Sequence, residues 1–336
     1  MNRKLNWILI MFAVSFGHSN GRFVMSINYS KTFDPKATQE FAEEAKIAVA
    51  DRRDRSIYVY TDEIVLAVNV ALATGRPLLV RGPSGCGKST LARNVSRTLR
   101  ARYYEDVISS RTQARDLLWQ MDLLRRLQDA QAEKLAPDFA PYVIPGVLWW
   151  AFNRESALAQ LARSRTGKGS FTEPGEYTGD LAVVLLDEID KADPDVPNNL
   201  LVPLGSLTFQ VQETGEQVHA NRAPLVFLTT NDERDLPPAF TRRCVELKIT
   251  SPTTEQLLAA GRAHFKGAPD ALLAEVAALF GVSGETGSHP PSTAEYLDTV
   301  RACLTLEIQP ASPMFEALSR VTVWKHGRTP GVRATS

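Results

Sequence analysis

One stretch constrains this chain more than any other. Residues 82–90 read Gly-Pro-Ser-Gly-Cys-Gly-Lys-Ser-Thr, after an apolar run at 77–80 and before a segment with helical spacing of apolar residues. A strand, a glycine-rich turn and a helix in this order form the context of a phosphate-binding loop. The glycines let several backbone N–H groups point at one anion, and the new helix directs its positive end at the same point. The stretch therefore predicts a site for a nucleoside triphosphate.

Every position of this loop is a candidate nucleotide contact. Lys88 is expected to reach the β- and γ-phosphates, and the hydroxyl of Ser89 to complete the shell of a bound Mg²⁺. Cys86 is most simply explained as a small residue at a variable position of the loop. A chance match in an ordinary glycine-rich turn is the alternative, and the flanking strand and helix disfavour it. The predicted binding positions are Gly82, Pro83, Ser84, Gly85, Cys86, Gly87, Lys88, Ser89 and Thr90.

A second motif follows residues 181–186, an unbroken apolar run that ends in Asp187-Glu188-Ile189-Asp190. Such a run is typical of a strand buried on both faces of a parallel sheet, and carboxylates at its end lie where open α/β sheets bind ligands. Asp187 is expected to hold Mg²⁺, directly or through water, and Glu188 to act as the general base on the attacking water. Alone, acids after a strand often just meet solvent. Downstream of a phosphate-binding loop they indicate hydrolysis.

A third apolar run at 225–228 leads to Thr229-Thr230-Asn231. Asn231 is a candidate to hydrogen-bond the attacking water or the γ-phosphate, and simple capping of the strand is the alternative. The basic pair Arg242 and Arg243 follows a short segment at 238–240. From the residues alone, a solvated basic pair is the simpler interpretation of these two arginines.

The overall composition narrows the class of protein. The 38 basic and 38 acidic side chains cancel, so no global charge attracts nucleic acid or an anionic membrane. The three cysteines are far apart and form neither a metal-binding spacing nor a disulfide framework, which indicates a reducing compartment. An apolar run at 7–16 resembles a short signal peptide, yet spanning a bilayer takes about 20 apolar residues. We expect a cytoplasmic protein with Met25 as its natural start; an anchor or export signal is the alternative.

The remaining pattern predicts the other elements. Helices are expected within 35–75, with Phe41 and Ala45 on one buried face and Asp62 as a helix cap, and over 112–135, with an apolar stripe that includes Leu124 and Leu127. A helix should end near residue 163, and another should start at Asp193. Strands are expected at 103–108 and 245–249, and a hairpin at 208–220.

From residue 252 onward the pattern predicts helices only, at 253–264, 269–280 and 292–306. The polar segment 164–180 is expected to be disordered in the free protein. These expectations divide the chain into an N-terminal extension that is non-native or disordered, an α/β nucleotide-binding domain, a helical lid domain and a disordered tail, at 1–34, 35–250, 251–325 and 326–336.

Four stretches together resemble a known family. They are YTDEIVLAVNVALATGRPLLVRGPSGCGKST at 60–90, VVLLDEIDKADP at 183–194, LTFQVQETGEQVHANRAPLVFLTTNDERDLPPAFTRRC at 207–244 and PPSTAEYLDTVRA at 290–302. In this order they resemble an AAA+ ATPase, and within that superfamily the MoxR-like branch. The resemblance covers about residues 35 to 325, and its first and third stretches are the most specific.

The resemblance implies an α/β fold of the P-loop NTPase type. A parallel five-stranded sheet sandwiched by helices, plus a small all-helical C-terminal lid, is expected, with the strand of Asn231 between the loop strand and the strand of Asp187. Asn231 would then act as sensor 1. Arg243 aligns best with the arginine finger, and Arg242 remains the alternative. The family's sensor 2 arginine has no obvious counterpart, because the lid helix begins Pro-Pro-Ser-Thr and Arg301 stands far along it.

The resemblance also implies a function. ATP and Mg²⁺ are the expected cofactors, and a finger that reaches the next subunit implies a self-assembled ring, usually a hexamer. MoxR-like proteins tend to remodel or mature a complex with a von Willebrand factor A-type partner, and the hairpin at 208–220 resembles an insert that touches partners. A non-hydrolysing nucleotide switch and a P-loop phosphotransferase are the alternatives. A GTPase is excluded by the lack of an Asn-Lys-x-Asp motif, and a nucleic-acid motor is disfavoured by the neutral charge.

Overall fold

The computed structural model describes residues 29–36, 57–164, 179–286 and 292–322, without side chains at 281–286. All elements named below lie within residues 33–336. The apolar run at 7–16, the buried face expected around Phe41, most of the segment 164–180 and the tail after 325 lie outside the described residues. Within the described ranges, no helix has both the length and the apolar character needed to cross a membrane.

A parallel five-stranded sheet forms the centre of the α/β part. Its strands are β1 (Leu78–Arg81), β2 (Arg102–Val107), β5 (Ala182–Asp187), β8 (Leu225–Thr230) and β9 (Val245–Lys248). They run in the order β2-β5-β8-β1-β9, with every neighbouring pair parallel. The strand before Asn231 thus lies between the loop strand and the strand of Asp187, as the resemblance implied. The carboxyl ends of all three strands meet at one edge.

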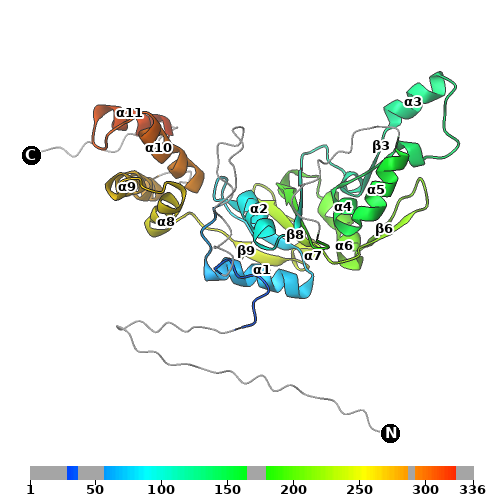
Figure 1. Cartoon of the computed structure of the whole chain (residues 1–336), viewed down its shortest axis with the longest axis horizontal. Helices are drawn as coiled ribbons and strands as arrows, with labels where there is room; N and C mark the ends of the chain where they lie inside the picture. Colours follow the sequence, from blue (N-terminus) through cyan, green and yellow to red (C-terminus); the bar gives the residue numbers. More distant parts are fainter. Residues whose placement is uncertain (1–28, 37–56, 165–178, 287–291, 323–336) are drawn as a thin grey trace, which may run out of the picture. The chain divides into compact units, whose positions relative to one another are not determined.

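Helices cover both faces of this sheet (Figure 1). Alternate strand residues point to opposite faces. Leu79, Leu186 and Leu228 pack with α4 (Val147–Phe152) and α6 (Asp195–Ser206). The opposite face packs with α1 (Asp62–Thr74) and α2 (Lys88–Thr98). Because both faces are buried, β5 and β8 read as unbroken apolar runs in the sequence.

Two predicted helix starts are off by one or two residues. The cap of α1 is Thr61, whose hydroxyl accepts a hydrogen bond from the Ile64 N–H at 3.3 Å, and Asp62 is the first helical residue. Likewise α6 is preceded by Pro194, so Asp193 lies just outside the helix. In both helices the first turn nevertheless carries acidic residues, and their negative charge complements the positive end of the helix dipole.

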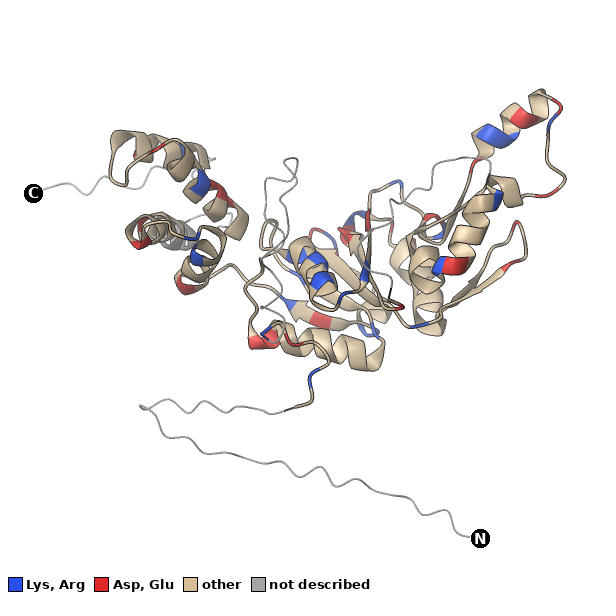
Figure 2. Ribbon diagram, in the orientation of Figure 1, with Lys and Arg blue, Asp and Glu red and all other residues tan. Residues whose placement is uncertain are grey.

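The prediction of one helix over 112–135 is wrong. The segment forms a 3₁₀ turn η2 (Ala114–Leu117), a strand β3 (Trp119–Met121) and a helix α3 (Leu123–Gln131). β3 pairs antiparallel with β4 (Val143–Pro145), and this long-range pairing overrides the helical spacing. As a result the expected apolar stripe is split. Leu117, which the same stripe included, is buried in the core, whereas Leu124 and Leu127 are 68% and 56% exposed on α3, a helix that also carries basic and acidic residues (Figure 2).

The helix that was expected to end near residue 163 is confirmed as α5, whereas the separate helix α4 before it was not predicted. Asn153 adopts an extended conformation after α4 and caps α5 (Arg154–Arg163) by accepting a hydrogen bond from the Ser156 N–H at 3.0 Å. A 3₁₀ turn η3 (Ala140–Tyr142) precedes β4. The hairpin of β6 (Thr208–Gln210) and β7 (Gln217–His219) is confirmed. Its Phe209 ring stacks on Trp119 at 5.8 Å, which fixes the hairpin to β3.

After β9 the described chain is helical, as expected. The elements are α8 (Thr254–His264), α9 (Asp270–Thr286), α10 (Thr293–Thr305) and α11 (Pro313–Thr322). The sequence did not predict α11, and α9 is longer than expected. These helices share an apolar core of their own that includes Leu257, Leu273, Tyr296, Val300 and Phe315.

Candidate functional site

The loop between β1 and α2 needs glycine at two positions for reasons of both conformation and space. Gly82 and Gly85 have φ angles of 151° and 77°, which L side chains rarely adopt. A Cβ atom at Gly82 would stand 2.3 Å from the backbone oxygen of Ile249, and one at Gly85 would stand 2.8 Å from the side chain of Ser292. The loop can therefore wrap this closely only without side chains at these positions.

Lys88 connects the loop with the end of β8. Its side chain is buried, at 7% exposure, and its Nζ donates hydrogen bonds to the backbone oxygens of Gly82 at 2.7 Å and Pro83 at 2.9 Å. A third hydrogen bond, of 2.7 Å, goes to Oδ1 of Asn231. A buried ammonium group requires such acceptors. The structure thus brings together two residues that stand far apart in the sequence.

Ser89 and Asp187 meet beside Lys88. The Ser89 hydroxyl lies 3.0 Å and 2.9 Å from the two carboxylate oxygens of Asp187. The Thr229 hydroxyl donates to Asp187 and accepts a hydrogen bond of 2.9 Å from the N–H of Glu188. A hydroxyl and a carboxylate are hard oxygen donors, so this pair fits Mg²⁺. Thr229 was not among the residues expected in the site, although a polar residue at the end of an apolar strand was a usable signal.

The acidic segment after β5 turns sharply. Glu188 has a φ of 61°, and the 3₁₀ turn η4 (Ile189–Lys191) follows it. The Glu188 carboxylate lies 2.9 Å from the Lys191 ammonium, and this hydrogen bond raises the pKa of Lys191. Asp190 is 2% exposed and accepts hydrogen bonds from the N–H groups of Asn231 at 3.2 Å and Glu233 at 3.1 Å. The turn is therefore linked to the residues after β8.

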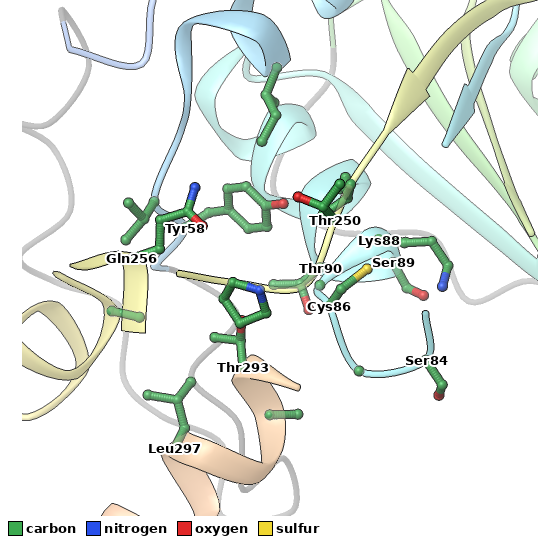
Figure 3. A pocket seen from close by; sticks show the side chains of 18 of the residues that line it. Tyr58, Ser84, Cys86, Lys88, Ser89, Thr90, Thr250, Gln256, Thr293 and Leu297 are labelled. Atoms are coloured by element: carbon green, nitrogen blue, oxygen red, sulfur yellow. The ribbon is translucent and has the colours of Figure 1, made fainter. Parts of the chain in front are cut away.

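A cavity of about 560 Å³ opens over these residues, a volume in the range of small-molecule sites. Figure 3 shows Ser84, Lys88 and Ser89 of the loop and α2 around it, together with Thr293 and Leu297 of α10. Its lining also includes polar residues at the ends of β5 and β8, apolar and aromatic residues, and one arginine: Asp187, Glu188, Asn231, Ile57, Tyr58, Val59, Ile249 and Arg301. Burial raises the pKa of Tyr58, so its hydroxyl stays neutral.

A family model decides the class of protein. The model of the AAA domain, dynein-related subfamily, matches residues 77–244, half of the chain. The chain belongs to the AAA domain family. The matched range contains the loop, the acidic segment, Asn231 and both arginines. AAA domains of this kind generally use ATP and Mg²⁺ and typically assemble into rings, so membership supports an ATP-binding ATPase.

Solved structures similar to this AAA protein are distant from it. A putative ATPase from Cytophaga hutchinsonii is 14% identical with a TM-score of 0.40, and the match covers 72% of this chain and 57% of that one. Two variants of RuvB from Thermotoga maritima are 14% and 15% identical with TM-scores of 0.44 and 0.42, covering 77% of this chain and 67% of each. No curated protein is significantly similar in sequence.

The arginines considered in the sequence differ in where they lie in this AAA protein. Arg242 and Arg243 are exposed at the end of α7 (Pro238–Thr241), and neither lines the cavity. Arg301, which stands too far along its helix to be an obvious candidate in the sequence, does line the cavity. Its Nη1 lies 3.8 Å from Oδ1 of Asp298. Helical periodicity could have found Arg301, because it lies two turns after Ala294 on the same face. Cys86, Cys244 and Cys303 are buried free thiols.

Proposed function

We propose that this protein is a Mg²⁺-dependent ATPase of the MoxR-like branch that forms a ring and remodels or matures a partner complex. One observation supports the proposal most strongly. Ser89 and Asp187 present oxygen donors at 2.9 Å from each other, directly beside the buried ammonium of Lys88 and the start of α2. A cation-binding pair next to an anion-binding loop is the arrangement that a nucleoside triphosphate with its metal ion requires.

The roles of the residues follow from their chemistry. Lys88 exchanges its hydrogen bonds with the loop carbonyls for bonds to the β- and γ-phosphate oxygens. Ser89 and Asp187 would hold Mg²⁺, which when bound would neutralise part of the negative charge on the phosphates. Glu188 accepts a proton from water as the water oxygen bonds to the γ-phosphorus and the bond from that phosphorus to the bridging oxygen breaks. Asn231 orients the water or the γ-phosphate, and ADP and inorganic phosphate leave.

A ring assigns a role to the arginine pair. Arg243, with Arg242 as the alternative, contacts the ATP of the neighbouring subunit. The exposure of both side chains and their absence from the cavity lining support action on another subunit. An arginine supplied in trans is worth about 10³-fold or more in rate. The expected partner is a von Willebrand factor A-type protein or another client protein.

The test is phosphate release from ATP over a series of protein concentrations. The specific rate should rise with concentration as the ring assembles. Glu188→Gln should bind ATP normally and lose about 10²-fold or more in rate, because it removes the general base. Glu155→Gln, an exposed residue of α5, is the matched control and should leave the rate unchanged. Hydrolysis by Glu188→Gln at the wild-type rate would refute the assigned base.

One contact favours a second candidate, a non-hydrolysing nucleotide switch. The Glu188 carboxylate is held by Lys191 at 2.9 Å, and a base engaged in an ion pair is less available to water. A switch predicts tight ATP binding without phosphate release at any protein concentration. A phosphotransferase would instead transfer the γ-phosphoryl group to a second substrate, with a phosphorylated product that mass spectrometry detects.

A further inference from the structure

Arg76 makes an unusual set of contacts across the chain. It stands between Gly75, which ends α1, and the start of β1. Its Nε donates a hydrogen bond to the backbone oxygen of Arg243 at 3.1 Å, and its Nη2 donates to those of Arg242 and of Cys244, the latter at 2.8 Å. One guanidinium group therefore binds three successive carbonyl groups that are 166 to 168 residues away in the sequence.

The geometry suits an arginine specifically. The carbonyl groups at the end of a helix have no partners within it, and those of 242–244 follow α7. A planar guanidinium group offers five N–H donors in a fixed fork, whereas the donors of a lysine all lie on one nitrogen atom. The N–H groups of Arg243 and Cys244 are bonded back to Phe240 and Thr241 at 3.0 Å and 2.9 Å. The backbone of this turn is thus held from two sides, while the side chains of Arg242 and Arg243 are exposed.

We propose that Arg76 is a positioning residue for the arginine that each subunit presents to the ATP of its neighbour. This inference rests on the proposed function, which assigns Arg243 or Arg242 to a neighbouring site. Displacing a catalytic group by about 1 Å can cost about 10²-fold in rate, so the backbone that carries it must be held firmly. Arg76 does not line the cavity of its own subunit. Its loss therefore affects the neighbour's site and leaves its own site intact.

The first measurement compares Arg76→Ala and Arg76→Lys with the wild type. Both variants should bind a fluorescent ATP analogue within about twofold of the wild type, while phosphate release falls about tenfold for alanine and less for lysine. Arg262→Ala is the matched control, because Arg262 is also exposed and bonds Asp270 at 3.0 Å. It should keep the wild-type rate. Wild-type phosphate release by Arg76→Ala would overturn the inference.

Mixed assemblies distinguish positioning from a merely structural role. Subunits with Lys88→Ala cannot bind ATP but still present a normal arginine to their neighbours. Mixed with Arg76→Ala subunits, they should raise phosphate release several-fold above the sum of the two separate rates. A mixture of Arg76→Ala with Arg243→Ala should give no such rescue, because both subunits lack a working arginine.

The outcomes separate this inference from the proposed function. If Lys88→Ala subunits rescue Arg243→Ala but not Arg76→Ala, Arg76 does not position the arginine, and the inference fails alone. If they rescue neither, no arginine acts between subunits, and the proposed function fails first. Should Arg76→Ala not fold, as judged by its melting temperature, Arg76→Lys takes its place in the same mixtures.

Discussion

At the scale of single residues, the geometry of the phosphate-binding loop leaves little freedom. Gly82 combines a φ angle of 151° with a backbone oxygen at 2.3 Å from the place a Cβ would occupy. Rotation of a side chain cannot relieve this contact, because the obstructing atom belongs to the backbone of Ile249. A methyl group here must displace the loop or the residue after β9.

The closeness of the Ile249 oxygen predicts what one added methyl group would cost in stability. Gly82→Ala should lower the free energy of unfolding by about 1–3 kcal/mol through backbone strain, with a further loss from the clash. Gly215→Ala is the matched control, because Gly215 also has a positive φ, of 72°, but nothing within 4 Å of a built Cβ. Gly215→Ala should lower the free energy of unfolding by only about 1–2 kcal/mol. Urea denaturation of both variants measures the difference, and equal costs would show that the contact with Ile249 is not restrictive.

At the scale of elements, a buried carboxylate links η4 to the end of β8. Asp190 accepts hydrogen bonds from two backbone N–H groups, those of Asn231 and Glu233. The link fixes the position of Asn231, whose side chain contacts Lys88. In this way the acidic segment, the third strand end and the loop form one connected unit.

Asp190→Ala should therefore be costly. It leaves two N–H groups without their acceptor, at about 1–3 kcal/mol for each that stays buried. Asp193→Ala is the control, because Asp193 is exposed and its side chain accepts a local hydrogen bond, from the nearby Asp195 N–H at 3.0 Å. The melting temperature of Asp190→Ala should fall well below that of Asp193→Ala. Similar values for the two variants would mean that water replaces the lost carboxylate freely.

At the scale of the whole molecule, the stability of the folded state should fall at alkaline pH. Burial is the main cause that raises the pKa values of Tyr58, Tyr60 and Tyr103 above their ordinary value of 10.0. All three lie in the layer between the sheet, α1 and α2. The folded state therefore holds these protons more tightly than the unfolded state does.

The direction of the pH effect follows. Below pH 10 both states are protonated, so the contribution of these tyrosines to stability is complete. As the pH rises above the ordinary pKa, the unfolded state ionises first, and stability falls progressively toward the raised pKa values. The melting temperature should decline from about pH 10 upward, and the absorbance of tyrosinate should appear together with unfolding. Tyr60→Phe should make the fall in melting temperature with pH less steep. An unchanged pH profile in that variant would contradict the contribution assigned to Tyr60.

Local features of the sequence were sufficient for several parts of this protein. The phosphate-binding loop, the runs that became β5 and β8, and the hairpin of β6 and β7 depend on glycine conformations, apolar continuity and turn residues that are close together in the chain. Each of these signals is local, so it survives without knowledge of the fold. The place of β8 between β1 and β5 was not a local signal; it was implied by the resemblance to the AAA+ family.

The tertiary structure decided what depends on distant partners. It split the segment 112–135 because β3 pairs with β4, and it exposed Leu124 and Leu127. It also brought Thr229 to Asp187 and Arg76 to the backbone after α7, over separations of 42 and at least 166 residues. Periodicity along the chain carries no information about such contacts, because they arise only when the sheet orders its strands and the turns at their ends meet.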